Sequence, residues 1–385
     1  MSTTQIYMTN EDIKGWIDDI KNDNALVLTG LEGEDCYGIG PYFSCYILHD
    51  EAEVHNLIKK IVRLFHCFSE IKNEDWTWVL NPAKDIMVEI DKFDIVTLEQ
   101  QCLKEYEKED FVSFSATCSD ETVFSSAVWG FEFTIDNSDI CYATFKVNFR
   151  YAWYLASHQN REIWHDFINE CIQSLKPMHA YSGFEIASAP LGREGGFERN
   201  TLERIAADYF YGLDIDHPMK MGFHTHFKTN GYIDYQGLGS GIRTPVWSFM
   251  LAPYWLKQLG MTWQQVIDYF APYPQVKISQ YIYDDHRVGL WIQLGELDLY
   301  PVEEGLPPLL VYANKLIRPI RCDHLELTIY DRWEDDPNPF FDYESGVAWM
   351  RRFDVAEDVE QYNKTKEIPE TLRALPEDIC PKTGW

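Results

Sequence analysis

The feature that most constrains the fold of this chain is a strand–helix–strand order, first seen between residues 41 and 80. Residues 41–50 (PYFSCYILHD) predict a strand, and 76–80 (WTWVL) predict a strand that returns beside it. Between them, residues 51–71 place six apolar side chains on one helical stripe: Val54, Leu57, Ile58, Ile61, Phe65 and Phe68. A helix with one apolar stripe has to bury it against a sheet or another helix.

The same order recurs further along the chain. Residues 141–155 (CYATFKVNFRYAWYL) alternate apolar and polar side chains and predict a long strand. Residues 161–175 (REIWHDFINECIQSL) then predict a second helix with one apolar face. Residues 180–190 (AYSGFEIASAP) predict the next strand, which a proline ends.

A third, looser unit follows. Residues 276–285 and 287–295 predict two strands, 307–320 predict a helix with proline in its first turn and at its exit, and 324–330 (HLELTIY) predict a strand. The sequence therefore predicts an α+β fold, with antiparallel or mixed sheets built from repeated strand–helix–strand units and helices packed on one face.

The chain of 385 residues is long enough for more than one domain. We expect an N-terminal α+β region over 1–135, a second α+β domain over 136–355 and an acidic tail over 356–385. A Ser-, Thr- and Asp-rich stretch at 116–139 marks the boundary between the first two. A helix-rich insert is expected at 197–272.

Two helix starts carry specific signals. Asn10 precedes the acidic residues of a first turn and predicts the beginning of an N-terminal helix. Thr262 followed by Gln265 is the pattern of a capping box, in which two side chains satisfy the free backbone N–H groups of a helix start.

The charge balance excludes some partners. Sixty-two acidic against 33 basic residues give a formal net charge of -29, while 45% hydrophobic and 15% aromatic residues predict a folded core. Such a chain repels nucleic acid and anionic lipid and attracts basic partners. An ordinary solvated surface accounts for the same balance, so the composition alone leaves both interpretations open.

The compartment is predicted from what the sequence lacks. The first twenty residues have no basic segment followed by an apolar one, and no window approaches the ~20 apolar residues of a membrane span. Nine cysteines are scattered without a CxxC spacing. These features predict reduced thiols and a cytoplasmic protein.

Residues 212–228 (GLDIDHPMKMGFHTHFK) hold the side chains best suited to chemistry: Asp214, Asp216, His217, His224 and His226. The two aspartates and the last two histidines are spaced by two, which puts each pair on one face of a strand. A metal-dependent hydrolase could use such groups, but no second ligand motif accompanies them. We predict that the segment is structural, with no metal, cofactor or catalytic residue, and keep the hydrolase as the alternative.

Other enzyme signatures are weaker. The chain has no GxSxG nucleophile elbow, no GxxxxGK[ST] phosphate loop and no GxGxxG after a strand. The glycine-rich residues 237–243 (GLGSGIR) have no lysine to meet a phosphate, and Pro245 stands where a helix would begin. We interpret this stretch as a turn or mobile loop.

Acidic residues mixed with aromatic ones stand out at 330–346 (YDRWEDDPNPFFDYESG) and at 281–287 (YIYDDHR). Aromatic anchors within an acidic rim suit a basic protein partner. The predicted partner-binding residues are Trp333, Glu334, Asp335, Asp336, Phe340, Asp342, Tyr343, Asp284 and Asp285. A solvated loop with inward-packed aromatic rings is the alternative.

The stretch 205–353 resembles a bacterial family of type VI secretion immunity proteins. The resemblance rests on ordered pieces: 207–216 (ADYFYGLDID), 240–260 (SGIRTPVWSFMLAPYWLKQLG), 288–321 (a Gly–aliphatic strand, prolines and a helix ending in PIR) and 349–354 (WMRRFD). It implies structural roles for the motif residues. Asp214 is expected in a Gly-Leu-Asp turn, Trp247 in a helix, and Pro319 and Arg321 at a helix exit.

The resemblance also implies a function. Members neutralise a partner toxin, often a nuclease, which fits an acidic protein that covers a basic cleft. We expect a non-enzymatic immunity protein that occludes its toxin stoichiometrically; its oligomeric state stays open. The alternatives are the hydrolase above, working through Asp214–His226, and an acidic chaperone or scaffold for a secreted effector, which would leave the bound toxin active.

Overall fold

The fold is that of a computed structural model of the chain. It describes residues 9–23, 27–28, 37–72, 74–84, 86–118, 129–137, 142–188, 196–217, 220–226, 232–235, 237–283, 286–328 and 338–355. Every structural statement below refers to these residues.

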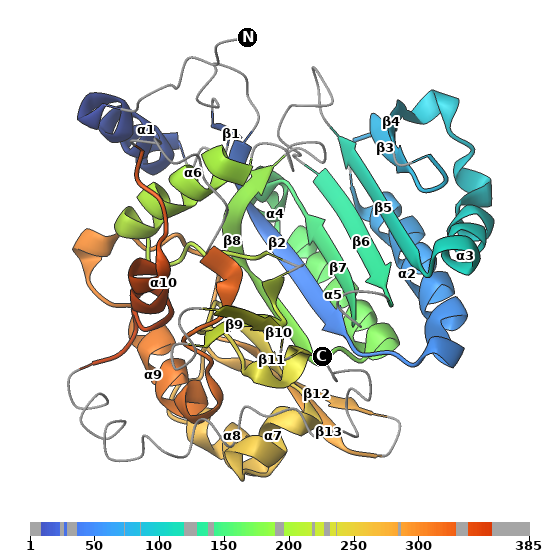
Figure 1. The fold of residues 1–385 in the computed structure, drawn as a ribbon. Helices are drawn as coiled ribbons and strands as arrows, with labels where there is room; N and C mark the ends of the chain where they lie inside the picture. The colour runs from blue at the N-terminus through green and yellow to red at the C-terminus, as the bar shows by residue number, and fades with distance from the viewer. Residues whose placement is uncertain are drawn as a thin grey trace.

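An eleven-stranded sheet runs through the molecule (Figure 1). Ten strands follow one another in the spatial order β12 (Lys277–Ile282), β13 (Val288–Gln293), β11 (Ser248–Leu251), β8 (His179–Ser188), β2 (Tyr37–Ile47), β7 (Tyr142–Asn148), β6 (Trp129–Asp136), β5 (Phe111–Cys118), β3 (Trp78–Asn81) and β4 (Ile86–Glu89). The short β1 (Val27–Leu28) pairs with β2. All these pairings are antiparallel. In this order β4 and β12 are the two edge strands of the described sheet.

The centre of the sheet is β2, which pairs with β7 on one side and β8 on the other. Successive side chains of a strand point to opposite faces. Phe43 and Cys45 of β2 accordingly belong to one buried apolar cluster, and Tyr42 and Tyr46 belong to another. The sheet is therefore buried on both faces along this strand.

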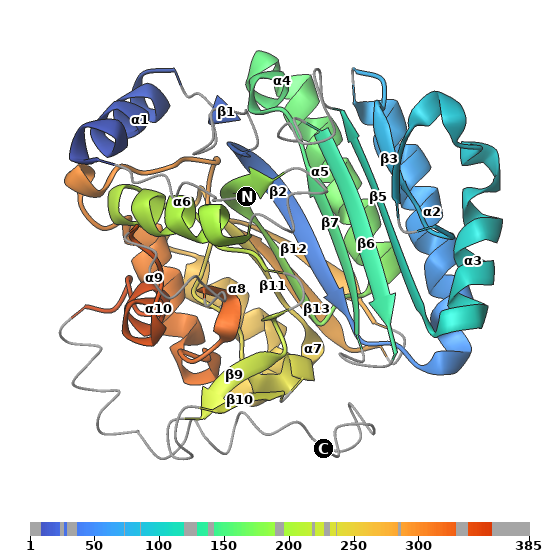
Figure 2. The ribbon, with the colours of Figure 1, turned by 45° about the horizontal axis from the view of Figure 1, so that its top comes forward.

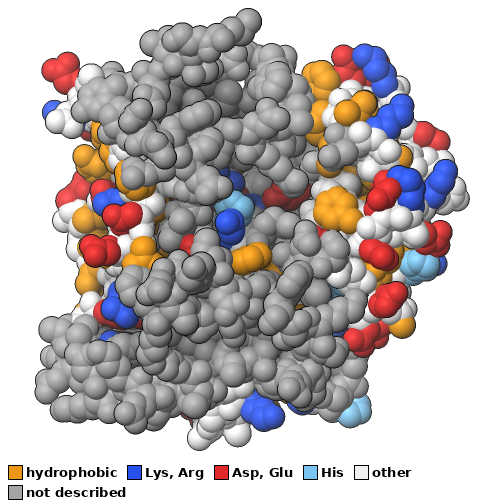
Figure 3. Space-filling model, viewed as in Figure 1, with side chains coloured by type: hydrophobic (Ala, Val, Ile, Leu, Met, Phe, Trp, Pro, Cys, Tyr) orange, Lys and Arg blue, Asp and Glu red, His pale blue; other side chains and the backbone are white. Residues whose placement is uncertain are grey.

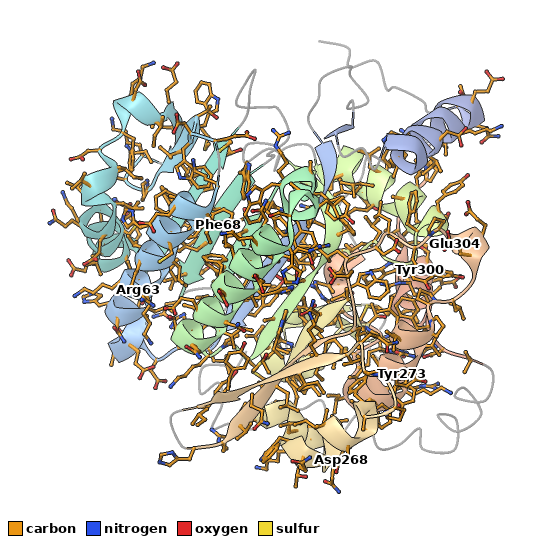
Figure 4. The ribbon with its side chains drawn as sticks, turned by 180° about the vertical axis from the view of Figure 1, so that it is seen from behind. Arg63, Phe68, Asp268, Tyr273, Tyr300 and Glu304 are labelled. Atoms are coloured by element: carbon orange, nitrogen blue, oxygen red, sulfur yellow. The ribbon has the colours of Figure 1, made fainter. Side chains whose placement is uncertain are left out.

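One face carries the helices of the first two strand–helix–strand units, α2 (Val54–Ile71) and α5 (His158–Leu175), together with α3 (Leu98–Glu109) and the short α4 (Tyr151–Ala156). Seen from behind, α2 and α5 lie over the strands (Figure 4). Phe68 of α2 shows the packing: its ring centroid lies 5.2 Å from that of Phe167 and 5.8 Å from that of Trp129. The apolar stripes predicted from the sequence are the buried faces of these helices.

The opposite face is buried by segments that follow β8, as Figure 2 shows for α9 and α10. These helices are α7 (Pro253–Leu259), α8 (Trp263–Phe270), α9 (Pro308–Ile317) and α10 (Tyr343–Met350). A smaller cluster joins α1 (Asn10–Asp23) and α6 (Gly196–Tyr209) to the ends of β2 and β8. A separate hairpin pairs β9 (Phe223–His226) with β10 (Tyr232–Tyr235).

The predicted α+β class is confirmed, with antiparallel pairing throughout the described sheet. The helices cover both faces of the sheet and not one face as predicted, because the central strands present apolar side chains on both sides. The order β2–α2–β3 and the order β7–α5–β8 are the predicted strand–helix–strand units. The N-terminal helix begins at Asn10, and Thr262 and Gln265 form the expected capping box of α8. None of the described helices is long and apolar enough to cross a membrane.

Two strand predictions were too long or wrong. The strand predicted over 141–155 ends at Asn148, and α4 follows from Tyr151. Asn148 pairs with Tyr42 as the last rung between β7 and β2, and one further bond, from the Phe149 N–H to the carbonyl of Pro41 at 3.2 Å, follows it before α4 begins. In the strand predicted over 324–330, Glu326–Thr328 form a 3-10 turn.

The predicted division of the chain stays a prediction. The pairing of β6 with β7 joins Asp136 to Tyr142 and carries one sheet across the expected boundary at 135. The expected tail, 356–385, lies outside the described residues. No disulfide joins any two of the six described cysteines, which are Cys45, Cys67, Cys102, Cys118, Cys171 and Cys322.

Candidate functional site

Residues 212–217, the first part of the stretch singled out at 212–228, run beside the end of β8. The backbone N–H of Asp214 donates to the carbonyl of Phe184 at 2.7 Å, and Leu213 and Phe184 form a parallel bridge. This extended backbone turns Asp214 and Asp216, two residues apart, towards the same side. Both side chains are completely buried.

Arg243 lies between these two carboxylates. Its Nη2 is 2.9 Å from Asp214 Oδ2 and its Nη1 is 2.6 Å from Asp216 Oδ1, with all three side chains fully buried. Its guanidinium also stacks 3.8 Å from the ring centroid of Tyr181. Arginine suits this position because its planar donors can bind two acceptors at once while its face packs on an aromatic ring.

Two tyrosines of β2 complete the carboxylate contacts. The Tyr42 hydroxyl donates to Asp214, and the Tyr46 hydroxyl donates to Asp216. The two tyrosines are four residues apart on one strand, so they face the same side as the aspartates they meet. Arg243 additionally donates from Nη2 to the Tyr42 oxygen at 2.6 Å.

A second ion pair adjoins the first. Lys146 of β7 lies 2.5 Å from Glu185 of β8 and 3.5 Å from Asp216, again with little or no exposure. The amide of Asn148 donates to Glu185 at 2.7 Å, and Arg199 lies 3.7 Å from the same carboxylate. We call Asp214, Asp216, Arg243, Lys146 and Glu185 the buried ion cluster.

Burial and the neighbouring cations shift the pKa values of these carboxylates in opposite directions. Burial raises the pKa of Asp214, although Arg243 opposes the rise. Burial would raise the pKa of Asp216 too, but Arg243 and Lys146 hold it below its ordinary value. Burial raises the pKa of Glu185 to about 7 against the opposing effect of Lys146. The cations therefore keep charged groups in an interior that would otherwise favour their neutral forms.

Two glycines allow the segments to come this close. A Cβ on Gly212 would lie 2.1 Å from the carbonyl oxygen of Asp298. Gly241, two residues before Arg243, has φ +149, and a Cβ there would lie 2.6 Å from Cys322 Cβ. The glycines of the GLD and SGIR motifs thus have a steric reason in this structure.

A second polar network holds the C-terminal motifs together. Arg321, after the exit of α9, contacts Asp323 at 2.6 Å and Asp354 at 2.9 Å, and donates to the Asn314 side chain at 2.6 Å. Its partners come from α9, from the turn after it and from the residues after α10. The PIR and WMRRFD pieces of the sequence meet here.

Two sequence interpretations need correction. The stretch 237–243 was predicted to be a turn or mobile loop; it contains a turn, the 3-10 turn Gly237–Ser240, but this turn is fully buried and leads to Arg243. No role was predicted for Arg243, although an arginine inside the apolar run GIRTPVWSF was an available signal. Trp247, which the resemblance placed in a helix, directly precedes β11, and its Nε1 donates to the carbonyl of Asp298 at 2.6 Å.

This arrangement argues against the hydrolase alternative, because the two carboxylates that it would use already have partners. Asp214 and Asp216 are already bound by Arg243 and by a tyrosine each. Burial lowers the pKa of His217 to about 3. His224 and His226 lie on β9, as predicted, but their side chains are outside the described part of the chain. The described side chains include no cluster of three or more potential metal ligands.

The predicted partner-binding residues are only partly described. Trp333, Glu334, Asp335, Asp336, Asp284 and Asp285 lie outside the described residues. Asp342 is exposed and caps α10, where Ser345 hydrogen bonds lower the pKa of its carboxyl. Tyr343 stacks on His324 and bonds its Nδ1 at 2.5 Å, and Phe340 is half-buried. Among these three, Asp342 presents its charge to solvent.

The fold and its polar networks define an α+β protein whose charged motif residues join buried segments of one large antiparallel sheet. The fold is similar to that of the Pseudomonas aeruginosa T6SS protein PA0821, with a TM-score of 0.70 and 15% sequence identity over 96% of this chain and 99% of that chain.

A family model described as TsiV, type VI immunity for VRR-NUC, matches residues 60–353. The chain belongs to this family of type VI immunity proteins. The match confirms the resemblance drawn from the sequence and begins well before residue 205, where that resemblance began. A comparison with curated proteins gives no match.

Proposed function

We propose that this protein binds the VRR-NUC-type nuclease effector that accompanies it and neutralises it by stoichiometric occlusion. The observation that carries the proposal is the immunity-family match over residues 60–353. A nuclease needs clustered Lys and Arg to hold the phosphate backbone of its substrate. A chain with a formal net charge of -29 is attracted to such a surface and competes with the nucleic acid for it.

The pairing of the buried charges supports a binding protein more than an enzyme. Each carboxylate of the buried ion cluster is already paired with a cation or a hydroxyl group. The protein would therefore act without a cofactor and without catalysis, in the cytoplasm, where a DNA-directed toxin acts. The acidic and aromatic segment 330–346, with Asp284 and Asp285, remains the contact surface proposed from the sequence.

Titration of the purified effector nuclease with this protein tests the proposal. We expect nuclease activity to fall in proportion to added protein and to vanish near equimolar amounts, because occlusion consumes one inhibitor per toxin. A bound but fully active nuclease would instead support the chaperone or scaffold alternative. Damaged DNA restored by catalytic amounts would support an enzyme. Absence of any complex at about 50 mM salt, where charge attraction is strongest, would refute the proposal.

A further inference from the structure

One edge of the large sheet ends in a short exposed strand. β4 pairs only with β3 in the described sheet, so its outer edge has no strand beside it. Ile86, at the start of β4, is 49% exposed. Val96, in the 3-10 turn Ile95–Thr97 that leads to α3, is 87% exposed and is the most exposed large apolar side chain of the described residues. Exposed apolar groups at a strand edge are typical of an interaction surface.

The same segment is strongly acidic. Residues 86–110 carry eight acidic and three basic residues. Two of the lysines pair with acids of the segment itself, Lys92 with Glu89 at 2.7 Å and Lys108 with Glu109 at 2.5 Å. Asp91, Asp94 and Glu99 form no salt bridge with any described residue. Figure 3 shows acidic side chains on the side of the molecule that carries α3, interspersed with basic and apolar ones.

The acidic surface rests on a rigid support. Leu98, Cys102 and Tyr106, spaced by four along α3, are buried in the core beneath the helix. The outward face is thereby held in place, and its carboxylates need little ordering when a partner binds.

We propose that residues 86–110, the β4–α3 edge, dock the cationic, nucleic-acid-binding face of the nuclease effector. The inference rests on the proposed function and adds a second contact region to the segment 330–346 with Asp284 and Asp285. Asp91, Asp94 and Glu99 supply negative charge that complements lysines and arginines of the effector, and Val96 supplies an apolar anchor within that acidic surface. Charge complementarity of this kind mainly accelerates association, whereas burial of an apolar anchor slows dissociation.

Association kinetics of the full chain with a catalytically inactive effector separate these contributions. The charge variant is Asp91→Asn/Asp94→Asn/Glu99→Gln. Its matched control, Glu162→Gln/Asp268→Asn/Glu304→Gln, removes three exposed acids elsewhere; Figure 4 labels two of them, Asp268 and Glu304, away from α3. We expect the charge variant to lower kon about tenfold at about 50 mM salt and much less at about 300 mM.

The control triple should keep kon within about twofold of the wild-type value, because steering depends on where charge is placed. Val96→Ser should raise koff about fivefold with little change in kon. All substituted side chains are outside the cores, so circular dichroism and thermal unfolding should match wild type. If the two triple variants had equal kon while the wild-type chain bound tightly, docking at the β4–α3 edge would be refuted and the proposed function would stand. If the wild-type chain did not bind the effector, both the docking site and the proposed function would be refuted.

Discussion

Arg243→Met gives a direct test of how the buried ion cluster supports the fold. The substitution keeps most of the side-chain volume and removes the cation that lies 2.9 Å from Asp214 and 2.6 Å from Asp216. Both carboxylates remain fully buried. Breaking a buried pair by removing one partner costs about 3 to 5 kcal/mol, because the remaining charge has no compensation in the interior.

We therefore expect Arg243→Met to lower the free energy of unfolding by about 4 kcal/mol. With an unfolding entropy of roughly 0.8 kcal/mol per kelvin for a chain of 385 residues, the melting temperature should fall by about 5 °C. Arg243→Lys should give an intermediate loss, because one ammonium group cannot bind both carboxylates in the planar geometry of the guanidinium. Thermal and urea unfolding, followed by circular dichroism, measure both changes.

Arg63→Met is the matched control. Arg63 pairs with Glu170 on the outer side of α2 and α5, with 57% of its side chain exposed (Figure 4). An exposed pair contributes at most about 1 kcal/mol. If Arg243→Met cost no more than Arg63→Met, the buried cluster would not stabilise the fold and the reasoning would be refuted.

The stability lost in Arg243→Met should also depend on pH and should be smaller at low pH. Without Arg243, burial raises the pKa of Asp214 and Asp216 above the values in the unfolded chain. A carboxyl group with a raised folded-state pKa binds its proton more tightly when folded, so the variant regains stability as the pH falls through that pKa. The gap between Arg243→Met and wild type should shrink from about pH 8 to about pH 5.

Two further substitutions test single features of the fold. Burial lowers the pKa of His179 to about 3, so folding excludes a proton that the unfolded chain binds below about pH 6.5. His179→Gln should therefore flatten the acid loss of stability by about 1.4 kcal/mol per pH unit in urea unfolding, and an unchanged slope would contradict this. Gly212→Ala should cost several kcal/mol of stability or abolish soluble expression, because the added Cβ would lie 2.1 Å from the Asp298 oxygen. Gly183→Ala is the control, because a Cβ there has no neighbour closer than 3.7 Å. An equally large loss of stability in Gly183→Ala would contradict the steric argument.

Helices with a one-sided apolar pattern could be predicted well from the sequence. The stripe from Val54 to Phe68 is the buried face of α2, and the capping box at Thr262 starts α8. These signals are local, since they depend on spacing within one helix. The end of β7 at Asn148 could not be predicted in this way, because it depends on where β7 stops pairing with its two neighbours, β2 and β6.

The role of residues 212–217 could be predicted only in part. Their spacing indicated that Asp214 and Asp216 share a side, and the resemblance indicated a structural role. Their partner Arg243 is 27 residues beyond Asp216, and Tyr42 is 172 residues before Asp214. No periodicity reports contacts over such separations. An isolated arginine in an apolar run becomes informative only once the sheet brings it to two buried carboxylates.

The pairing of β2 with β8 has a consequence for how the chain is made. Ten consecutive rungs, from Tyr37 with Ser188 to Tyr46 with His179, join strands that are far apart in the sequence. The nascent chain therefore displays β2 to solvent until most of its first half has left the ribosome. Long-range pairing of this kind slows folding and leaves strand edges open meanwhile.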